Sequence, residues 1–355
     1  MSIKIEVQNY QNENELNEFV TNPENMACLW HSLEWKQILE KEYSYKPFYL
    51  LAKENDTVCG VLPLFQIKSM VTGNRLVSLP FSYYCGIVTS SVDVQIKLVN
   101  EAQELANKLN CNYLELKMQK PLQEDVILKT RLLETTYYYT SILKLYEDSN
   151  ENWKKLDTRR TRWAINKAKR SGVEIKTETD INDLKIFYNL KVKTRRKHGS
   201  PTHSLKFFKS IMEKFKREDL VKLWVAVHDK QIISALIFYT FKDTVMPAYI
   251  AADEKYNSFM PSNLLYWNAI EWGCNNGYKY FDFGRTEPNN EDLLKFKTKW
   301  GCDNYKIPYY YYPIVPNLMS KNRDSTKAGI ITGVWKKLPV PILKILGPKL
   351  IKHLG

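Results

Sequence analysis

The sequence predicts an α/β fold in which one kind of unit is used twice. The chain has 355 residues, which is long for a single hydrophobic core. Helix-like and strand-like segments alternate in a similar order in both halves. A short aromatic strand at residues 278–283 stops at Gly284 and is followed by charged residues, which is typical of a ligand site in an open α/β sheet. We therefore expect two domains, at residues 1–148 and 149–318, and a basic tail at 319–355.

The first half begins with a strand and an acidic helix within residues 1–25. The segment HSLEW at residues 31–35 starts a second helix, with Ser32 as its N-cap and Trp35 at the third helical position. Strand-like runs and one amphipathic pattern then predict strands at residues 46–52, 57–68, 75–79, 113–117 and 137–145, and a helix at 93–109. We expect the last strand to close the first unit.

The second half repeats this order. Residues 153–171 are predicted as one basic helix that stops before Gly172, because apolar residues recur at a spacing of three to four. The next predicted elements are strands at 173–177, 221–228, 232–241 and 245–251, and helices at 181–197, 205–215 and 262–275. A short polar helix after residue 290 is expected to direct Phe296 to the core and Lys297 to solvent or to a site.

Composition excludes several classes of protein. Residues 1–24 are polar throughout, unlike a signal peptide, and no stretch reaches the roughly 18 uncharged apolar residues of a membrane span. The six cysteines are scattered without a CxxC pair, and the five histidines do not cluster with carboxylates. We therefore expect reduced, buried thiols in a cytoplasmic protein, and neither a metal site nor a disulfide framework.

The positive charge is unevenly distributed. The net charge is +13; residues 151–217 hold 20 Lys and Arg against 7 Asp and Glu, and residues 321–355 hold 8 against 1. Such a concentration predicts a surface that meets anions, such as nucleic acid, phosphorylated carriers or acidic lipid. A purely solubilising surface is the alternative.

Seven short segments occur in a characteristic order between residues 30 and 312. They are HSLEW (31–35), LPFSYYCG (79–86), RWAINKAKRSG (162–172), RRKHGSP (195–201), PSNLLYWNAI (261–270), FDFGR (281–285) and FKTKWG (296–301). With these segments the chain resembles the FemABX family of peptidyl transferases and the related acyltransferases encoded with exopolysaccharide genes. The resemblance implies two tandem GNAT-like (acyl-CoA N-acyltransferase) domains with a substrate channel between them. It also implies the type without a coiled-coil arm, because the helix ending at Lys197 continues directly to Leu205.

The resemblance also implies an activity. It indicates an acyl- or aminoacyltransferase that forms an amide on an amino group of a cell-envelope precursor, of the peptidoglycan or lipid-linked polysaccharide type. Such an enzyme contributes to cell-wall biogenesis and cell shape. It would hold no tightly bound cofactor and would use aminoacyl-tRNA or acyl-CoA as co-substrate.

The loop at residues 254–263 bears on the choice of donor. GNAT folds hold the pyrophosphate of coenzyme A on backbone N–H groups of a glycine-rich loop, but this loop contains no glycine. This favours an aminoacyl-tRNA donor or a changed donor pose. The helix start at Ser262 and Asn263 remains a candidate for binding one anion.

Within the resemblance, Lys297 is the first candidate for the reaction centre. The family places a lysine directly after this phenylalanine, where its ammonium group would offset the negative charge of the tetrahedral state. Asp282 is a candidate acceptor for the amine proton, and a turn-capping side chain is its alternative role.

Further side chains are candidates for binding substrate. Basic residues able to clamp a diphosphate by charge-assisted hydrogen bonds are Arg195, Arg196, Lys197 and Arg285. Aromatic residues that would line the channel, or else pack in a core, are Trp35, Tyr83, Tyr84 and Tyr249.

Two basic segments suggest partners. The helix at 153–171 combines cationic side chains with tryptophans and is a candidate surface for tRNA. The tail alternates apolar residues with lysines and is broken by Pro339, Pro341 and Pro348. It predicts either an anchor on the inner face of the plasma membrane or a helix packed on its own domain. A non-catalytic tandem-GNAT protein that binds RNA or acidic membranes is the alternative to the enzyme.

Overall fold

The computed structural model describes residues 3–8, 13–70, 72–313 and 326–355. The chain folds into two compact units. The first comprises Met1–Tyr138, Lys306–Arg323 and Lys352–Gly355, and the second comprises Tyr139–Tyr305 and Asp324–Ile351. The division therefore falls ten residues before the boundary predicted at 148.

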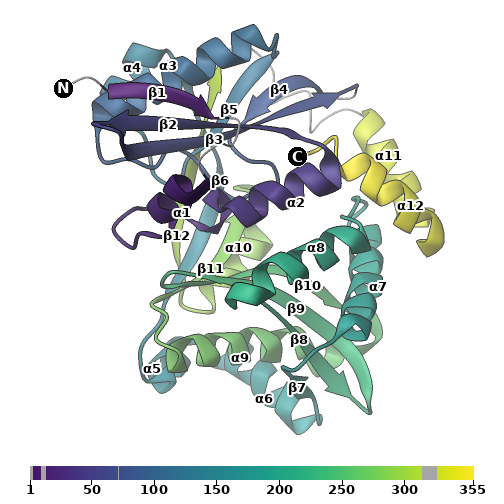
Figure 1. Cartoon of the computed structure of the whole chain (residues 1–355). Helices are drawn as coiled ribbons and strands as arrows, with labels where there is room; N and C mark the ends of the chain where they lie inside the picture. The colour runs from purple at the N-terminus through teal and green to yellow at the C-terminus, as the bar shows by residue number, and fades with distance from the viewer. Residues whose placement is uncertain (1–2, 9–12, 71, 314–325) are drawn as a thin grey trace. The chain divides into compact units, whose positions relative to one another are not determined.

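The first unit is a sheet with helices on both faces (Figure 1). Its elements are β1 (Ile3–Gln8), α1 (Glu13–Thr21), η1 (Leu29–His31), α2 (Leu33–Tyr43), β2 (Lys46–Glu54), β3 (Thr57–Ser69), β4 (Gly73–Val77), α3 (Val92–Lys108), β5 (Tyr113–Lys117) and α4 (Glu124–Thr130). Neighbouring strands from β1 to β4 are antiparallel, and β4 pairs with β5 in parallel. A parallel pair needs a crossover, which α3 supplies. The apolar face of α3, including Leu98 and Ala102, packs on Leu62 and Leu114 of the sheet.

The second unit repeats this arrangement. Its elements are α5 (Ser149–Lys155), η2 (Thr158–Arg162), α6 (Trp163–Arg170), β7 (Glu174–Lys176), α7 (Ile181–Lys197), α8 (Leu205–Phe215), η3 (Lys216–Glu218), β8 (Val221–His228), β9 (Gln231–Phe241), β10 (Thr244–Ala252), η4 (Glu254–Phe259), α9 (Pro261–Asn275), β11 (Tyr280–Thr286) and α10 (Glu291–Thr298). Strands β7 to β10 are antiparallel, and β10 pairs with β11 in parallel through the crossover helix α9. The expected use of one α/β unit twice is confirmed.

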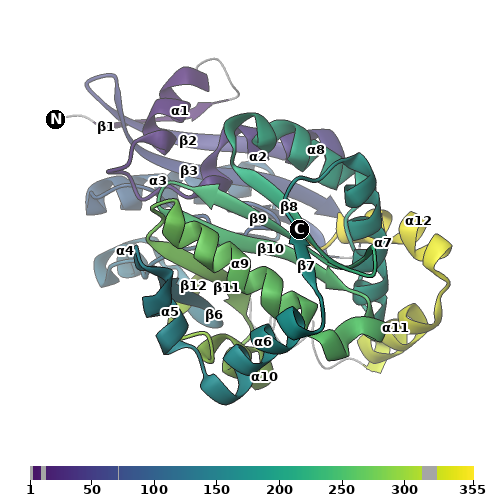
Figure 2. The same ribbon diagram turned by 90° about the horizontal axis from the view of Figure 1, so that it is seen from below.

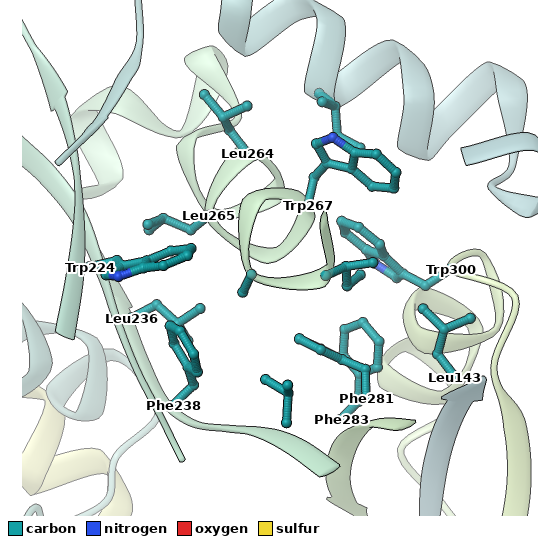
Figure 3. Close-up of a cluster of buried hydrophobic side chains, with 14 of the residues drawn as sticks. Leu143, Trp224, Leu236, Phe238, Leu264, Leu265, Trp267, Phe281, Phe283 and Trp300 are labelled. Carbon is teal, nitrogen blue, oxygen red and sulfur yellow. The ribbon is translucent and has the colours of Figure 1, made fainter. Parts of the chain in front are cut away.

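The second unit has its core between α9 and the sheet (Figure 3). Figure 2 shows α9 lying along the sheet. Large aromatic residues fill this layer: Trp267 from α9, Trp224 from β8 and Phe281 from β11 are each less than 7% exposed, and Trp300 is fully buried. Such side chains bury enough apolar area to hold the strands and helix in a fixed arrangement.

One strand in each unit comes from the other half of the sequence. Strand β6 (Leu133–Lys144) follows the first half, yet its residues from Tyr139 onward pair antiparallel with β11 in the second unit. Strand β12 (Asp303–Tyr312) follows the second half, yet Tyr309 to Tyr312 pair antiparallel with β5 in the first unit. The expectation that the strand at 137–145 closes the first unit is therefore wrong, and β12 was not predicted.

Two predicted elements have different limits in the structure. The helix predicted at 153–171 is interrupted, because Leu156 is extended between α5 and the π-helical turn η2. Trp163, one of the regularly spaced apolar residues on which that prediction depends, is 45% exposed. The strand predicted to stop at Gly284 continues to Thr286 through a β-bulge.

The tail forms two helices, α11 (Thr326–Lys337) and α12 (Val340–Ile351), and both contact α7. Pro348 lies inside α12 and does not end it, contrary to expectation. Residues 319–325 of the predicted tail lie outside the described residues. Residues 352–355 belong to the first unit, where Tyr45 donates a 2.5 Å hydrogen bond to the carbonyl of Lys352. Among the described residues, no helix has the length and apolarity needed to cross a membrane.

Candidate active site

Strands β10 and β11 separate soon after they meet. They pair in parallel only at Thr244 with Tyr280 and at Val245 with Phe281. Beyond this point β10 continues to pair with β9, and β11 continues to pair with β6. The facing edges of β10 and β11 therefore have backbone groups outside the sheet ladder, which are suited to hydrogen-bonding a ligand.

A β-bulge shapes β11 beside this opening. The register with β6 shifts between Asp282 and Arg285, and Gly284 has φ of 73°. Glycine adopts this left-handed conformation without the steric cost that a Cβ atom would add. The bulge directs the Gly284 carbonyl toward α10, where Lys297 Nζ donates a 2.5 Å hydrogen bond to it.

Lys297 is a buried cation. Its exposed fraction is 4%, although it lies near the end of a short polar helix. Burial lowers the pKa of Lys297 to about 8, while the nearby Asp282 and Cys302 act in the opposite direction. At pH 7 the group is still mainly an ammonium, and its single hydrogen bond to Gly284 leaves two N–H donors for another acceptor. The lysine therefore points into the protein, and its catalytic role stays a prediction.

Asp282 is held by its neighbours. Its Oδ1 accepts hydrogen bonds from the Thr140 hydroxyl at 2.5 Å and from the Gly284 N–H at 2.8 Å, and the residue is 1% exposed. These contacts connect β6, the bulge and the carboxylate. They suit a side chain that fixes the bulge better than one that exchanges protons with a substrate.

A group of basic side chains lies along α7. Lys191 Nζ donates to the Ile250 carbonyl at 3.1 Å and lies 5.5 Å from the centre of the Tyr249 ring. Arg195 Nε donates to the Pro201 carbonyl at 3.0 Å. His203 stacks on Phe207 and meets Tyr249 edge-on, with ring centres 5.9 Å apart.

This group has an excess of positive charge. Burial and the nearby Arg195 lower the pKa of Lys191 to about 7, and burial together with Arg195 and Lys191 lowers the pKa of His203 to about 3. Among the described residues, neither Lys191 nor Arg195 forms a salt bridge. An anion binding here would relieve the mutual repulsion of these groups.

The other two basic residues of the RRKHG segment point elsewhere. Arg196 Nε donates to the carbonyl of Lys336 in α11 at 2.9 Å, and Lys197 forms an exposed ion pair of 2.6 Å with Glu254. Of the three basic residues in this segment, only Arg195 lies close enough to Lys191 and His203 to lower the pKa of both groups.

Comparisons with known proteins agree with this geometry. Residues 157–306 match the family model of the acetyltransferase (GNAT) domain. The chain has the tandem GNAT fold, and the family match covers residues 157–306 of it.

Three solved structures have a similar fold over most of this chain. FemX is 13% identical, with a TM-score of 0.68 over 87% of this chain and 97% of that chain. The C-terminal domain of a putative lysylphosphatidylglycerol synthetase from Agrobacterium fabrum is 10% identical, with a TM-score of 0.58 over 84% and 91%. A tandem GNAT protein from the clavulanic acid biosynthesis pathway is 9% identical, with a TM-score of 0.56 over 87% and 98%. No curated protein sequence matches the chain.

The aromatic candidates of the first GNAT unit differ in exposure. Trp35 is fully buried and packs edge-on against Trp30, with 4.7 Å between ring centres, and Tyr84 is 4% exposed. Tyr83 is half-buried, and its carbonyl accepts a 2.8 Å hydrogen bond from the Tyr309 hydroxyl. Tyr83 is therefore better placed to meet a ligand than Trp35.

The remaining candidates lie in the second GNAT unit. Arg285 is exposed one residue after the bulge glycine. Asn263 is half-buried in the first turn of α9, where its backbone N–H donates to the Met260 carbonyl at 3.1 Å. That contact occupies one of the N–H groups expected to bind an anion.

Sequence reasoning missed Lys191 and His203. One signal was available for Lys191, because it precedes Arg195 by one helical turn and such residues share a helix face. His203 has no local signal, since it reaches Tyr249 only through the connection between α7 and α8.

Two surface hollows, one in each unit, involve other residues. One in the first unit is lined by residues including Glu15, Phe19 and Cys59, and one in the second by residues including Lys176, Asp219 and Trp224. No predicted site residue lines either hollow. Chemistry requires positioned groups as well as concavity, and the buried, hydrogen-bonded groups lie around Lys297 and Lys191.

Proposed function

We propose that this chain transfers an acyl or aminoacyl group to an amino group of a cell-envelope precursor, of the peptidoglycan or lipid-linked polysaccharide type, and forms an amide. The observation that carries the proposal is the buried Lys297, held on the bulge of β11 beside the opening between β10 and β11. The similarity to FemX and to a putative lysylphosphatidylglycerol synthetase supports an envelope-related acceptor.

The reaction joins a neutral amine to the donor carbonyl. As the C–N bond forms, negative charge develops on the carbonyl oxygen, and the bond to the leaving sulfur or ester oxygen then breaks. The amine loses one proton, which leaves with the departing group or passes to solvent. Lys297 offers two N–H donors and a fixed positive charge to the developing oxyanion, and one such donor contributes on the order of 2–4 kcal/mol.

Asp282 has a positioning role in this scheme. Its carboxylate accepts from the Gly284 N–H, and the Gly284 carbonyl accepts from Lys297. The bulge at Gly284 therefore lies between the Asp282 carboxylate and the Lys297 ammonium group, and it holds both at fixed positions. This arrangement pre-organises the ammonium, so little reorganisation is needed when charge develops.

Arg195 and Lys191 are the proposed contacts to an anionic group of the acceptor. A phosphate or diphosphate there would bring the negative charge that this group of side chains lacks among the described residues. Arg195 presents a guanidinium fork for charge-assisted hydrogen bonds to phosphate oxygens. Arg285, Asn263, Tyr83 and Tyr249 are proposed as further contacts to substrate.

Aminoacyl-tRNA and acyl-CoA are the two candidate donors. GNAT domains use acyl-CoA as co-substrate. The surface of η2 and α6 supports tRNA, because Arg159, Arg160 and Arg170 are exposed there and Lys167 Nζ lies 5.0 Å from the centre of the exposed Trp163 ring. The exposed apolar residues of α12, which include Ile345 and Leu350, support peripheral binding to the inner face of the plasma membrane.

Replacing Lys297 tests the proposal directly. Purified Lys297→Ala protein is incubated with aminoacyl-tRNA or acyl-CoA and with candidate envelope precursors, and the mass gain of the acceptor is measured. We expect a loss of about 10²–10³-fold in the transfer rate. Lys295→Ala is the matched control, because Lys295 lies on the same helix, is exposed and pairs with Glu291 at 2.8 Å. Equal activity of the two folded variants would remove Lys297 from the reaction centre.

A further inference from the structure

The first unit gathers two thiols and an imidazole that the candidate active site does not use. Cys28 lies just before η1, His31 ends η1, and Cys85 lies in the segment after β4. The ligand atoms of the three residues lie within 4.8 Å of one another. The residues are 8%, 2% and 0% exposed, respectively, so water is largely excluded from the cluster.

Hydrogen bonds orient the His31 ring. Its Nε2 lies 3.0 Å from the Gly86 carbonyl oxygen, and because a carbonyl only accepts, Nε2 carries a proton. In the neutral ring, Nδ1 then turns its lone pair toward Cys28, whose Sγ lies 3.2 Å away. Metal-ligating histidines are commonly oriented in this way, with the second ring N–H donated to a backbone carbonyl.

We propose that Cys28, His31 and Cys85 bind one zinc ion, with a fourth position open to water or another small ligand. Zinc favours thiolate and imidazole ligands in tetrahedral geometry, with bonds of about 2.3 Å to sulfur and about 2.0 Å to nitrogen, so its ligand atoms lie about 3.5–3.8 Å apart. The 3.2 Å between Sγ of Cys28 and Nδ1 of His31, and the 4.8 Å limit for the whole set, lie on either side of these values. Small side-chain rotations would therefore seat the ion.

The charge balance of the site suits its burial. Binding releases the two thiol protons to solvent and transfers no electrons. Two thiolates then neutralise the two charges of the ion, so the buried centre carries no net charge. The ion would replace the 3.1 Å hydrogen bond from the Cys28 N–H to Nδ1 of His31, and also the contacts of the Cys28 thiol with this Nδ1 and with the Tyr84 carbonyl.

The ion would connect two segments that are distant in the sequence. It would hold η1, which leads into α2 through the Ser32 cap, to the segment that carries Tyr83 and Tyr84. Scattered cysteines gave no sign of this, because the ligands meet only after β2, β3 and β4 have formed. The inference does not depend on the transferase proposal, since metal binding is measured without substrate.

The test uses the whole chain, purified with reductant and without chelators. Zinc content is measured first, and the metal-free protein is then titrated anaerobically with Co²⁺. We expect one equivalent of metal per chain, with sulfur-to-cobalt charge-transfer absorption and the intense visible bands of tetrahedral Co²⁺. Added Zn²⁺ should bleach these bands. A wild-type protein that binds neither ion, or that shows a Cys28–Cys85 disulfide in its place, overturns the proposal.

Variants and protection measurements locate the metal. Cys85→Ser and His31→Gln should each weaken Co²⁺ binding at least about 100-fold, since loss of a direct ligand costs no less than loss of its hydrogen-bond partner. Cys111→Ser is the matched control, because Cys111 is a half-buried free thiol of the same unit outside the cluster. If Cys85→Ser fails to fold, the site is tested in the wild type by measuring how fast each cysteine thiol is alkylated with and without zinc. Zinc should protect Cys28 and Cys85 but not Cys59 or Cys111, and equal protection of all four thiols refutes the site.

Discussion

Burial of Lys297 as a cation costs free energy in the folded protein. Its pKa of about 8 lies below the ordinary value of 10.5, so the folded protein disfavours the ammonium by roughly 3 kcal/mol. The hydrogen bond to Gly284 recovers part of this energy. Such a cost at a non-structural position is typical of residues retained for function.

Replacement of Lys297 by methionine should therefore stabilise the fold while it abolishes transfer. The unfolded chain binds the lysine proton more tightly than the folded protein does, so wild-type stability rises with pH between about 8 and 10.5. We expect the free energy of unfolding of Lys297→Met to be about 1–2 kcal/mol higher than that of the wild type at pH 7, once the lost hydrogen bond is subtracted. This difference should disappear above pH 10. Urea unfolding at several pH values measures the stability difference at pH 7 and its change with pH. A Met variant less stable than wild type at pH 7 would contradict this account.

Lys191 should set the pH dependence of acceptor binding. Its pKa of about 7 means that the charged form declines as the pH rises from 6 to 8, whereas His203, with a pKa of about 3, stays neutral. We expect the KM for a phosphorylated acceptor to rise over this range in the wild type. In Lys191→Met it should be about tenfold higher and nearly independent of pH, because one charge-assisted hydrogen bond is lost.

The control for this measurement lies on the same helix. Lys193→Met changes an exposed lysine that is 3.8 Å from Asp253, and it should leave the acceptor KM unchanged. If both variants raise KM equally, general surface charge rather than the Lys191 group binds the acceptor.

At the scale of single elements, local patterns were reliable where packing agreed with them. The helices at 181–197 and 205–215 and the strands at 113–117 and 221–228 have the predicted limits. Ser32 also caps α2 as expected, accepting from the Trp35 N–H. The prediction failed where a side chain breaks a local pattern.

The interrupted basic helix shows why it failed. Asp157 caps η2 by accepting from the Arg160 N–H, and its own backbone N–H donates to the Lys299 carbonyl. The helical spacing of the apolar residues continues across this break, so the sequence alone does not show it. The partner of Asp157 lies far along the chain and only the fold brings it near.

The surface formed by η2 and α6 provides a test of the donor. We expect Arg159→Glu combined with Arg160→Glu to weaken binding of aminoacyl-tRNA about tenfold or more and to reduce the salt dependence of that binding, because phosphate contacts release counterions. Transfer from acyl-CoA should be unaffected. Lys206→Glu on α8 is the control, as an exposed lysine on another element. Equal binding of tRNA by all three proteins would exclude this surface.

At the scale of the whole chain, the repeat was predictable and the exchange of strands was not. Both halves carry the same order of elements in the sequence, and the FDFGR and FKTKWG segments indicated the region of Lys297 and Asp282. The pairing of β6 with β11 and of β12 with β5 depends on contacts between distant segments. Hydrophobic patterns specify which residues are buried, not which strand lies beside them. The Cys28 cluster escaped prediction for the same reason.

The C-terminal helix α12 has two apolar stripes with different environments. Leu343 and Ile351 are buried, and Gly347 lies against Thr202, where a Cβ atom would come within 3.2 Å of the backbone carbonyl oxygen. The second stripe is exposed. It comprises Ile342, Ile345, Leu346 and Leu350, which are between 37% and 61% exposed, with Lys349 exposed beside them. Packing on the second unit therefore accounts for one stripe only, and the other stripe fits an anionic membrane surface.

Vesicle binding tests this surface. We expect the wild type to bind vesicles that contain phosphatidylglycerol more tightly than vesicles of phosphatidylcholine, and to bind less at high salt, because each lysine near an anionic surface contributes about 1 kcal/mol. Ile345→Glu with Leu350→Glu should abolish this binding and change the thermal midpoint little, since the two residues are 61% and 41% exposed. Leu128→Glu makes the same kind of change at an exposed site of the first unit and should bind as the wild type does. Loss of binding in Leu128→Glu as well would show that net charge, rather than α12, governs attachment.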